Sequence, residues 1–225
     1  MSKGLICQSS SPVAARALFA RTPDGGLRFC IQYRYINSKT MKNWYPLPLI
    51  RETLNIHQGA TIYTKLDVRG AYNLLRVKEG DEHELAIRTT YGLFEPTVMQ
   101  FGIMNAAADF QGDINNTIRE VLDDFTSAYL DDILIYSNLE EEHVEHVKWV
   151  MQHLLVAGLY LKPEKCVFHM ETARYLGLSI STDGISTDED KVGMVQNWSR
   201  GKRTKNGRLN NLIEVQQFLR FCNYY

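Results

Sequence analysis

Two adjacent aspartates, Asp131 and Asp132, constrain the fold of this chain more than any other feature. They stand between two short apolar stretches, residues 128–130 and 133–135. Because strands disfavour aspartate and turns accept it, the pattern predicts a tight hairpin that carries both carboxylates at its turn. Two carboxylates about 4 Å apart repel by about 1 kcal/mol in water and by about 4 kcal/mol at an effective dielectric near 20. A bound divalent cation removes that cost, and Mg²⁺ prefers such hard oxygen ligands.

A third aspartate, Asp67, lies near the end of an expected strand over residues 61–68, just before Gly70. If this strand lies beside the hairpin in one antiparallel sheet, the three carboxylates meet at one spot. Three carboxylates can hold two Mg²⁺ ions about 3.5–4 Å apart, an arrangement that supports in-line displacement at phosphorus. The alternative is an ordinary acidic turn, as expected for Asp123-Asp124. Periodicity alone leaves these two interpretations about equal.

Composition narrows the class of protein. The 225 residues are 44% hydrophobic and 23% charged, which excludes a wholly disordered chain. A net charge of −1 excludes recognition by bulk positive charge, although a local basic groove remains open. The four widely separated cysteines favour a reducing compartment. Because no apolar run reaches about 18 residues, no membrane-spanning helix is expected.

The order of the expected elements favours an α+β fold over a doubly wound sheet. Strands are expected over 13–21 and 28–35, as a hairpin with Arg28 and Arg34 on one face. Further elements are expected in this order: a helix over 50–58, strands over 61–68, 74–77, 85–90 and 93–99, and helices over 105–122 and 140–157, the first with Asn105 as N-cap.

The C-terminal third is expected to contain strands within 159–185, interrupted at Gly177 and Gly184, and a short helix closed by Trp198. An exposed basic loop over 199–210 and the first part of a helix over 212–225 follow. The helix over 140–157 carries three histidines, His143, His146 and His153. A solvated helical face is favoured over a zinc site for them, because no cysteine or carboxylate cluster has matching spacing.

The segment Tyr129-Leu130-Asp131-Asp132 resembles the Tyr-x-Asp-Asp box of reverse transcriptases. Many other blocks recur in the order of that family, and the resemblance covers nearly the whole chain. It is similar to the reverse transcriptase of gypsy-type long-terminal-repeat retrotransposons. The blocks are Tyr33–Asn37, Tyr45–Pro48, Lys65–Asp67, Phe94–Gly102, Asn105-Ala106, Phe110-Gln111, Asp131–Ser137, Gly158–Leu161, Lys165-Cys166, Tyr175–Gly177, Asp183–Ile185 and Phe221–Tyr225.

The resemblance implies a right-handed polymerase of fingers and palm, with an antiparallel palm sheet, packed helices and only a partial thumb. Residues 1–60 would form part of the fingers and the start of the palm. Residues 61–185 would form the palm with a returning fingers segment, and 186–225 the start of the thumb. The ribonuclease H and integrase regions of the parent polyprotein are expected but absent here. A cytoplasmic retrotransposon particle is the implied location, and a nuclear one stays open.

The resemblance also implies roles for individual residues. Asp67, Asp131 and Asp132 match the catalytic residues that bind two Mg²⁺ (or Mn²⁺) ions. Tyr129 and Leu130 would contact the primer end and the new nucleotide. Four residues would bind the incoming nucleotide: Arg28, Tyr72, Phe101 and Gly102.

Two of these nucleotide-binding assignments have ordinary alternatives. Tyr72 would exclude a 2′-hydroxyl from the site, and its alternative is a core tyrosine. Arg28 would grip the triphosphate, as the fork-like geometry of arginine suits phosphate. A solvated charge on a strand is about equally compatible with Arg28.

The implied function is an RNA-directed DNA polymerase, the reverse transcriptase core of a retrotransposon polyprotein. It would transfer deoxynucleotides to a primer 3′-hydroxyl on an RNA or DNA template, without a membrane partner. The alternative is a degenerate, inactive retroelement fragment with weak nucleic-acid binding, because four positions depart from the family pattern: Gln32, Gln100, Ala107 and Asp109. A polymerase that copies RNA into RNA is disfavoured by the bulk of Tyr72.

Overall fold

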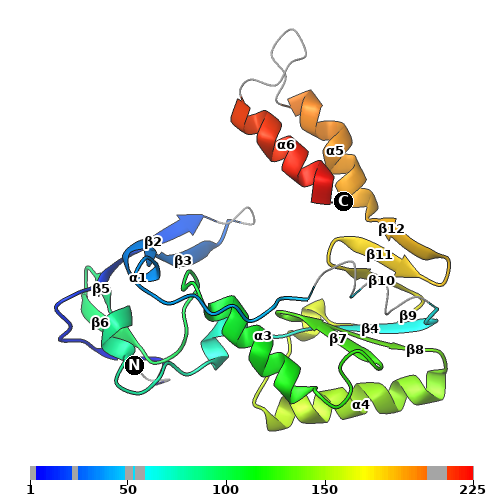
Figure 1. Ribbon diagram of the computed structural model, residues 1–225, viewed down its shortest axis with the longest axis horizontal. Coiled ribbons are helices and arrows are strands. Elements are labelled where there is room, and N and C mark those ends of the chain that lie inside the picture. The colour runs from blue at the N-terminus through cyan, green and yellow to red at the C-terminus, as the bar shows by residue number, and fades with distance from the viewer. Residues whose placement is uncertain (1–3, 22–24, 49–52, 54–58, 202–211, 225) are drawn as a thin grey trace. The chain divides into compact units, whose positions relative to one another are not determined.

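The computed structural model describes all residues except 1–3, 22–24, 49–52, 54–58, 202–211 and 225. It also does not describe the side chains of Arg28 and of some residues in the last two helices. Figure 1 shows the helices and strands of the chain, which divides into two compact units. Unit 1 comprises Met1–Pro48, Leu66–Ile133 and Lys148–Cys166, and unit 2 comprises Leu49–Lys65, Leu134–Val147 and Val167–Tyr225. The elements are helices and mainly antiparallel strands, so the predicted α+β class is confirmed.

Five strands of unit 1 form one sheet in the order β1-β6-β5-β2-β3. Neighbouring strands are antiparallel except β2 and β5, which are parallel. Phe19 faces Phe29 across the β2–β3 pair, with ring centroids 5.3 Å apart, and such aromatic cross-strand pairs stabilise a sheet. The strands are β1 (Ile6–Gln8), β2 (Ala15–Arg21), β3 (Leu27–Ile31), β5 (Ile87–Thr89) and β6 (Gly92–Pro96).

The predicted strand over 28–35 is wrong beyond Ile31, because the chain turns there into the short helix α1 (Arg34–Asn37). Tyr33 causes this turn. Its side chain is 3% exposed, packs in a cluster with Val77 and Leu85, and donates a hydrogen bond of 3.0 Å to the carbonyl of Leu85. Arg28 and Arg34 therefore do not share a face of one strand.

The segment after β4 is less extended than predicted. Gly70 adopts φ +65°, a left-handed conformation, and the 3₁₀ helix η1 (Ala71–Leu74) follows. The predicted strand over 74–77 is reduced to a single bridge between Arg76 and Val98. The predicted strands over 85–90 and 93–99 correspond to β5 and β6, and the 3₁₀ helix η2 (Glu82–Leu85) precedes β5.

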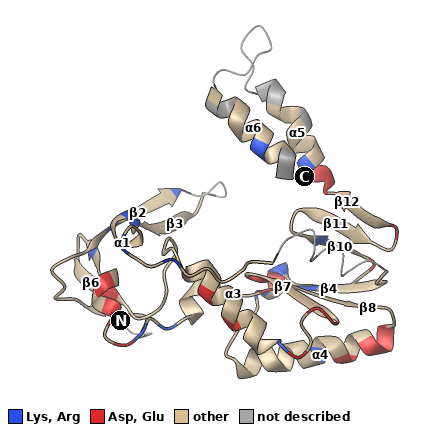
Figure 2. Cartoon of the chain, in the orientation of Figure 1, with Lys and Arg blue, Asp and Glu red and all other residues tan. Residues whose placement is uncertain are grey.

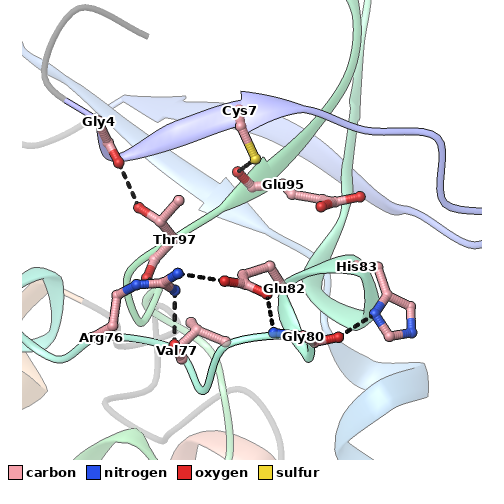
Figure 3. Close-up of polar contacts among 9 residues, drawn as sticks. All are labelled: Gly4, Cys7, Arg76, Val77, Gly80, Glu82, His83, Glu95 and Thr97. Carbon is pink, nitrogen blue, oxygen red and sulfur yellow. Dashed lines mark hydrogen bonds and ion pairs between the residues drawn. The ribbon is translucent and has the colours of Figure 1, made fainter.

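Arg76 ties this irregular segment together (Figure 3). Its guanidinium donates hydrogen bonds of 2.7 Å to the carbonyls of Val77 and Thr97 and pairs with the carboxylate of Glu82. The hydrogen bond from Arg76 lowers the pKa of Glu82. Thr97 in turn donates to the carbonyl of Gly4, which fastens the start of the described chain to the end of β6.

A second sheet has the strand order β7-β8-β4-β9. Its strands are β4 (Ile62–Asp67), β7 (Thr126–Tyr129), β8 (Asp132–Ser137) and β9 (Val167–Met170). Residues 133–135 are fully buried, which explains why β8 is continuously apolar rather than alternating. The predicted strand over 61–68 is confirmed as β4, and the predicted hairpin is confirmed as β7 and β8.

The two long predicted helices are present as α3 (Ala106–Thr117) and α4 (Glu140–Val156). Asn105 occupies the N-cap position of α3 but makes no capping bond, because its side chain bonds to Met41 and Asn43 instead. The helix α3 ends before Ile118, short of the predicted residue 122. Three glutamates form the first turn of α4 (Figure 2), where they suit the helix dipole.

The C-terminal part contains the predicted strands as an antiparallel sheet of β10 (Thr172–Tyr175), β11 (Leu178–Ser181) and β12 (Gly184–Thr187), which follow η3 (Pro163–Lys165) and β9. Two helices follow, α5 (Glu189–Gly201) and α6 (Leu212–Tyr224), in which Trp198 packs against Phe218 and Phe221.

Two other predicted elements fall partly on residues that the structure does not describe. The predicted basic loop is wrong for residues 199–201, which belong to α5, and its remainder lies outside the described residues. The predicted helix over 50–58 also lies outside them, Thr53 excepted. Within the described part, none of the helices combines the length and apolarity needed to cross a membrane.

Candidate active site

The turn between β7 and β8 carries the two adjacent aspartates, as predicted. Leu130 adopts φ +53°, a left-handed conformation that costs roughly 1–2 kcal/mol for a residue with a side chain. The carbonyl of Asp131 accepts a hydrogen bond of 2.8 Å from the backbone N–H of Val68. The turn is therefore fastened to the end of β4, immediately after Asp67.

Asp67 is 7% exposed, and lysines surround its carboxylate. The Lys162 Nζ lies 2.6 Å from Oδ1, and the Lys165 Nζ lies 3.5 Å from Oδ2. The backbone N–H of Lys162 also donates to the carbonyl of Asp67 at 2.9 Å. Because a buried carboxylate without a counter-charge is costly, these two lysines offset the cost of burying Asp67.

The convergence of the three carboxylates of Asp67, Asp131 and Asp132 at one spot stays a prediction. Within the described residues, no group of three histidine, cysteine, aspartate or glutamate side chains is arranged to hold a metal ion. The strand and the turn that carry the aspartates are joined through Val68 and Asp131, but Lys162 and Lys165 engage the carboxylate of Asp67. The roles of Asp67, Asp131 and Asp132 as metal ligands stay predictions.

Tyr72 lies near the turn and contacts aromatic residues of two other segments. Its ring makes edge contacts with Phe101 and Phe110, at centroid distances of 4.9 and 6.0 Å. Burial raises the pKa of Tyr72, and electrostatic repulsion from Asp131 and Tyr129 raises it further. Tyr72 is half-buried, so it is neither a fully buried core residue nor a solvated one.

Phe101 and Gly102 lie in the loop before α3. Phe101 is 58% exposed, which leaves most of its ring available to a partner. Gly102 adopts φ +98°, and a Cβ there would lie 3.4 Å from the carbonyl oxygen of Ile31. The side-chain amide of Asn37 donates to the carbonyl of Gly102 at 2.7 Å. The loop therefore requires glycine at this position and is fixed against α1.

The structure does not bring Arg28 to the turn through any described contact. Its backbone pairs with Ala20 in the β2–β3 hairpin, and its side chain lies outside the described part of the chain. Its assignment to the triphosphate stays a prediction.

The residues near the loop before α3 that depart from the family pattern have ordinary structural surroundings. Gln100 donates from its side-chain amide to the carbonyl of Val98 at 3.1 Å. Asp109 accepts a hydrogen bond of 2.7 Å from the side chain of Asn43. Ala107 lies half-buried in the first turn of α3. These departures from the family pattern are therefore accommodated by the local fold.

The prediction of a solvated histidine face is wrong for His143, which is 1% exposed. Its Nε2 lies 2.7 Å from the Thr64 hydroxyl and its Nδ1 lies 2.9 Å from the Ser137 hydroxyl. Burial lowers the pKa of His143 to about 4, with contributions from His169 and His146. A 3.6-residue period alone could not identify this polar pair on β4 and β8.

Gln111 belongs to one of the blocks shared with the family, but the sequence alone indicates no role for it. Its side chain is fully buried in α3 and bonds to the backbone on both sides of Tyr129, at Ala128 and Leu130. A buried amide in a helix next to an aspartate-bearing hairpin is a signal, but only the folded chain shows which backbone groups it reaches.

Comparison with solved structures shows the fold. The chain aligns with the foamy viral protease-reverse transcriptase in complex with double-stranded DNA at a TM-score of 0.89 and 20% identity, over 99% of this chain and 38% of that one. A second structure, the foamy viral protease-reverse transcriptase in complex with an RNA/DNA hybrid, aligns at a TM-score of 0.83 and 19% identity, over 98% and 28%. These similarities agree with the polymerase fold implied by the sequence.

Comparison with known sequences shows the family. The chain is 40% identical over 224 residues to the Tf2-3 and Tf2-7 transposon polyproteins of Schizosaccharomyces pombe. These matches cover 100% of this chain and 16% of each relative, so the chain spans about a sixth of their length. Residues 20–180 match the family described as reverse transcriptase (RNA-dependent DNA polymerase). This chain therefore belongs to the reverse transcriptase family.

Proposed function

We propose that this chain is the RNA-directed DNA polymerase core of a gypsy-type long-terminal-repeat retrotransposon polyprotein. The observation that carries the proposal is the β7–β8 turn, where Asp131-Asp132 is fastened to the end of β4 beside Tyr72. Its reaction would join a primer 3′-hydroxyl to the α-phosphorus of a deoxynucleoside triphosphate and release pyrophosphate. The ordered motifs along the sequence support the gypsy-type assignment.

The proposed partners are an RNA or DNA template, its primer and deoxynucleoside triphosphates. The foamy viral relatives of similar fold are complexes with double-stranded DNA and with an RNA/DNA hybrid, which supports a template–primer duplex here. In this assignment Tyr129 and Leu130 face the primer end, and Phe101 and Gly102 lie beneath the new base pair. We also propose that residues 1–60 form part of the fingers and the start of the palm, residues 61–185 the palm with a returning fingers segment, and residues 186–225 the start of the thumb.

The donor chemistry of Asp67, Asp131 and Asp132 fits Mg²⁺ or Mn²⁺, because all three offer hard carboxylate oxygens. In the proposed site, the carboxylates of Asp67, Asp131 and Asp132 would together hold the cations. Bound cations would lower the pKa of the primer hydroxyl and neutralise the leaving pyrophosphate. The chain itself contributes the rigid turn that keeps two like charges adjacent.

Tyr72 is the proposed barrier to ribonucleotides. Its ring is fixed edge-on between Phe101 and Phe110, so it is a rigid surface for the sugar of the incoming nucleotide. We expect Tyr72→Ala to raise ribonucleotide incorporation relative to deoxynucleotide incorporation by about tenfold or more, since steric discrimination of one small group is worth about 1–3 kcal/mol. Competition between the two nucleotides in single-nucleotide addition measures this ratio. An unchanged ratio would remove Tyr72 from this role.

Primer extension on an RNA template tests the proposed function. The 225-residue chain is incubated with an RNA template, a DNA primer, Mg²⁺ and a single deoxynucleotide. The addition of one nucleotide to the primer is measured. Single addition is chosen because it does not depend on processivity. Addition of the nucleotide complementary to the template is the expected result. Template–primer binding without any addition would instead support the inactive fragment that binds nucleic acid.

A further inference from the structure

The left-handed conformation of Leu130 has a specific partner in the neighbouring helix. The backbone N–H of Leu130 donates a hydrogen bond of 2.8 Å to the Oε1 of Gln111, which lies in the second turn of α3. Leu130 separates Tyr129 from Asp131, so its backbone conformation sets the direction in which the aspartates leave the turn. A single side-chain bond thus reaches the backbone at the centre of the candidate site.

The side-chain NH₂ group of Gln111 also makes hydrogen bonds. The Nε2 of Gln111 donates 3.0 Å to the carbonyl of Ala128 and 2.8 Å to the Oδ1 of Asn115. A carbonyl can only accept and a backbone N–H can only donate, so Ala128 and Leu130 together fix which end of the amide faces each of them. The side chain is fully buried and has both donors and its acceptor satisfied.

Asn115, which bonds to Gln111, is itself held by Tyr45. The side-chain amide of Asn115 donates 2.9 Å to the hydroxyl of Tyr45. The ring of Tyr45 packs over Gly112, where a Cβ would lie 3.5 Å from the ring. The chain of contacts therefore runs from Tyr45 through Asn115 to Gln111, and then to both sides of Tyr129. All of these residues belong to unit 1.

We propose that Gln111 is a positioning residue, which holds the backbone from Ala128 to Leu130 so that Tyr129 and the two aspartates are directed for nucleotide addition. This inference rests on the proposed polymerase function and names a residue that acts through the turn rather than on the substrate. Glutamine suits this task because one planar amide reaches an N–H and a carbonyl of the same strand end. A nonpolar side chain would remove the partner that Gln111 gives to the N–H of Leu130 and to the carbonyl of Ala128.

The test replaces Gln111 by methionine, which keeps the length of the side chain and removes all three hydrogen bonds. We expect Gln111→Met to lower the rate of single-nucleotide addition about 10- to 100-fold, because small displacements of reacting groups carry losses of this size. The affinity for template–primer duplex should change less than threefold. Amide hydrogen exchange of Leu130 should become faster than in the unsubstituted chain.

Two variants control for a general loss of stability. Gln152→Met makes the same replacement at an exposed position of α4 and should match the unsubstituted chain. Ile118→Val removes a buried methyl group at the end of α3 and should lower the melting temperature while keeping nucleotide addition within twofold. If Gln111→Met does not fold, Gln111→Glu keeps the acceptor for Leu130 and should add nucleotides more slowly than the unsubstituted chain.

The outcomes separate this inference from the proposed function. If a folded Gln111→Met variant adds nucleotides within twofold of the normal rate, or leaves exchange at Leu130 unchanged, the positioning role is overturned. If Gln111→Met fails to fold and Gln111→Glu adds nucleotides at the normal rate, it is overturned as well. If the unsubstituted chain adds no nucleotide, the proposed function fails, whereas exchange at Leu130 still decides whether Gln111 holds the turn.

Discussion

Asp131→Asn is expected to reduce single-nucleotide addition by roughly 10³-fold or more. The substitution keeps the size of the side chain and the backbone hydrogen bond from Val68, but it removes one of two adjacent charges at the turn. Cation binding at developing charge contributes several kcal/mol to such reactions, and about 4 kcal/mol corresponds to roughly 10³-fold in rate. The measurement is the single-turnover rate on an RNA template at saturating Mg²⁺.

Asp123→Asn is the matched control for this loss. Asp123 is an exposed aspartate in the turn before β7, and it adopts φ +65°, which asparagine also tolerates. The same change of charge at Asp123 should leave the rate within twofold. Equal rates for Asp131→Asn and the unsubstituted chain would rule out the assigned chemistry at the turn.

The stability of the fold is expected to fall between pH 6.5 and pH 4 because of His143. The pKa of His143 is lowered to about 4 in the folded chain, whereas an unfolded histidine titrates near 6.5. The unfolded chain therefore binds a proton that the folded chain resists, so the contribution is fully present above pH 6.5 and is lost as the pH falls. The maximal loss is about 3 kcal/mol.

Urea unfolding at a series of pH values from 7.5 to 4 measures this contribution. His143→Gln does not titrate and should show a smaller fall in the free energy of unfolding over this range. His153→Gln, on the same helix, should retain the fall of the unsubstituted chain, because His153 is less buried and stacks on Trp149. The same pH dependence in His143→Gln and in the unsubstituted chain would show that His143 is not the group responsible.

The fold class and the position of the aspartate turn could be predicted because each depends on local pattern. The alternation around residues 62–67 and the apolar flanks of Asp131-Asp132 correctly indicated β4 and the β7–β8 hairpin. The acidic first turn of α4 and Gly158 after it also marked a helix correctly. Such signals involve residues close together in the sequence, so period and turn chemistry suffice to find them.

The errors came from contacts between residues far apart in the sequence. The expected strand over 28–35 stopped at Ile31 because Tyr33 is buried against Leu85, 52 residues away. The lysines that engage Asp67 lie 95 and 98 positions later, where sequence spacing gives no information about ion pairs. Gln111 reaches a backbone 17 and 19 positions later. Side-chain partners of this kind depend on tertiary packing, which no local pattern contains.

Cation binding tests the central claim most directly, because it does not require turnover. Binding of Mn²⁺ to the chain with template–primer and a non-hydrolysable deoxynucleotide can be followed by electron paramagnetic resonance, with binding to the nucleotide alone subtracted. We predict two bound Mn²⁺ ions per chain, and affinity that falls about tenfold or more in both Asp131→Asn and Asp67→Asn. Binding that is equal in these two variants and in the unsubstituted chain would contradict a shared cation site at Asp67, Asp131 and Asp132.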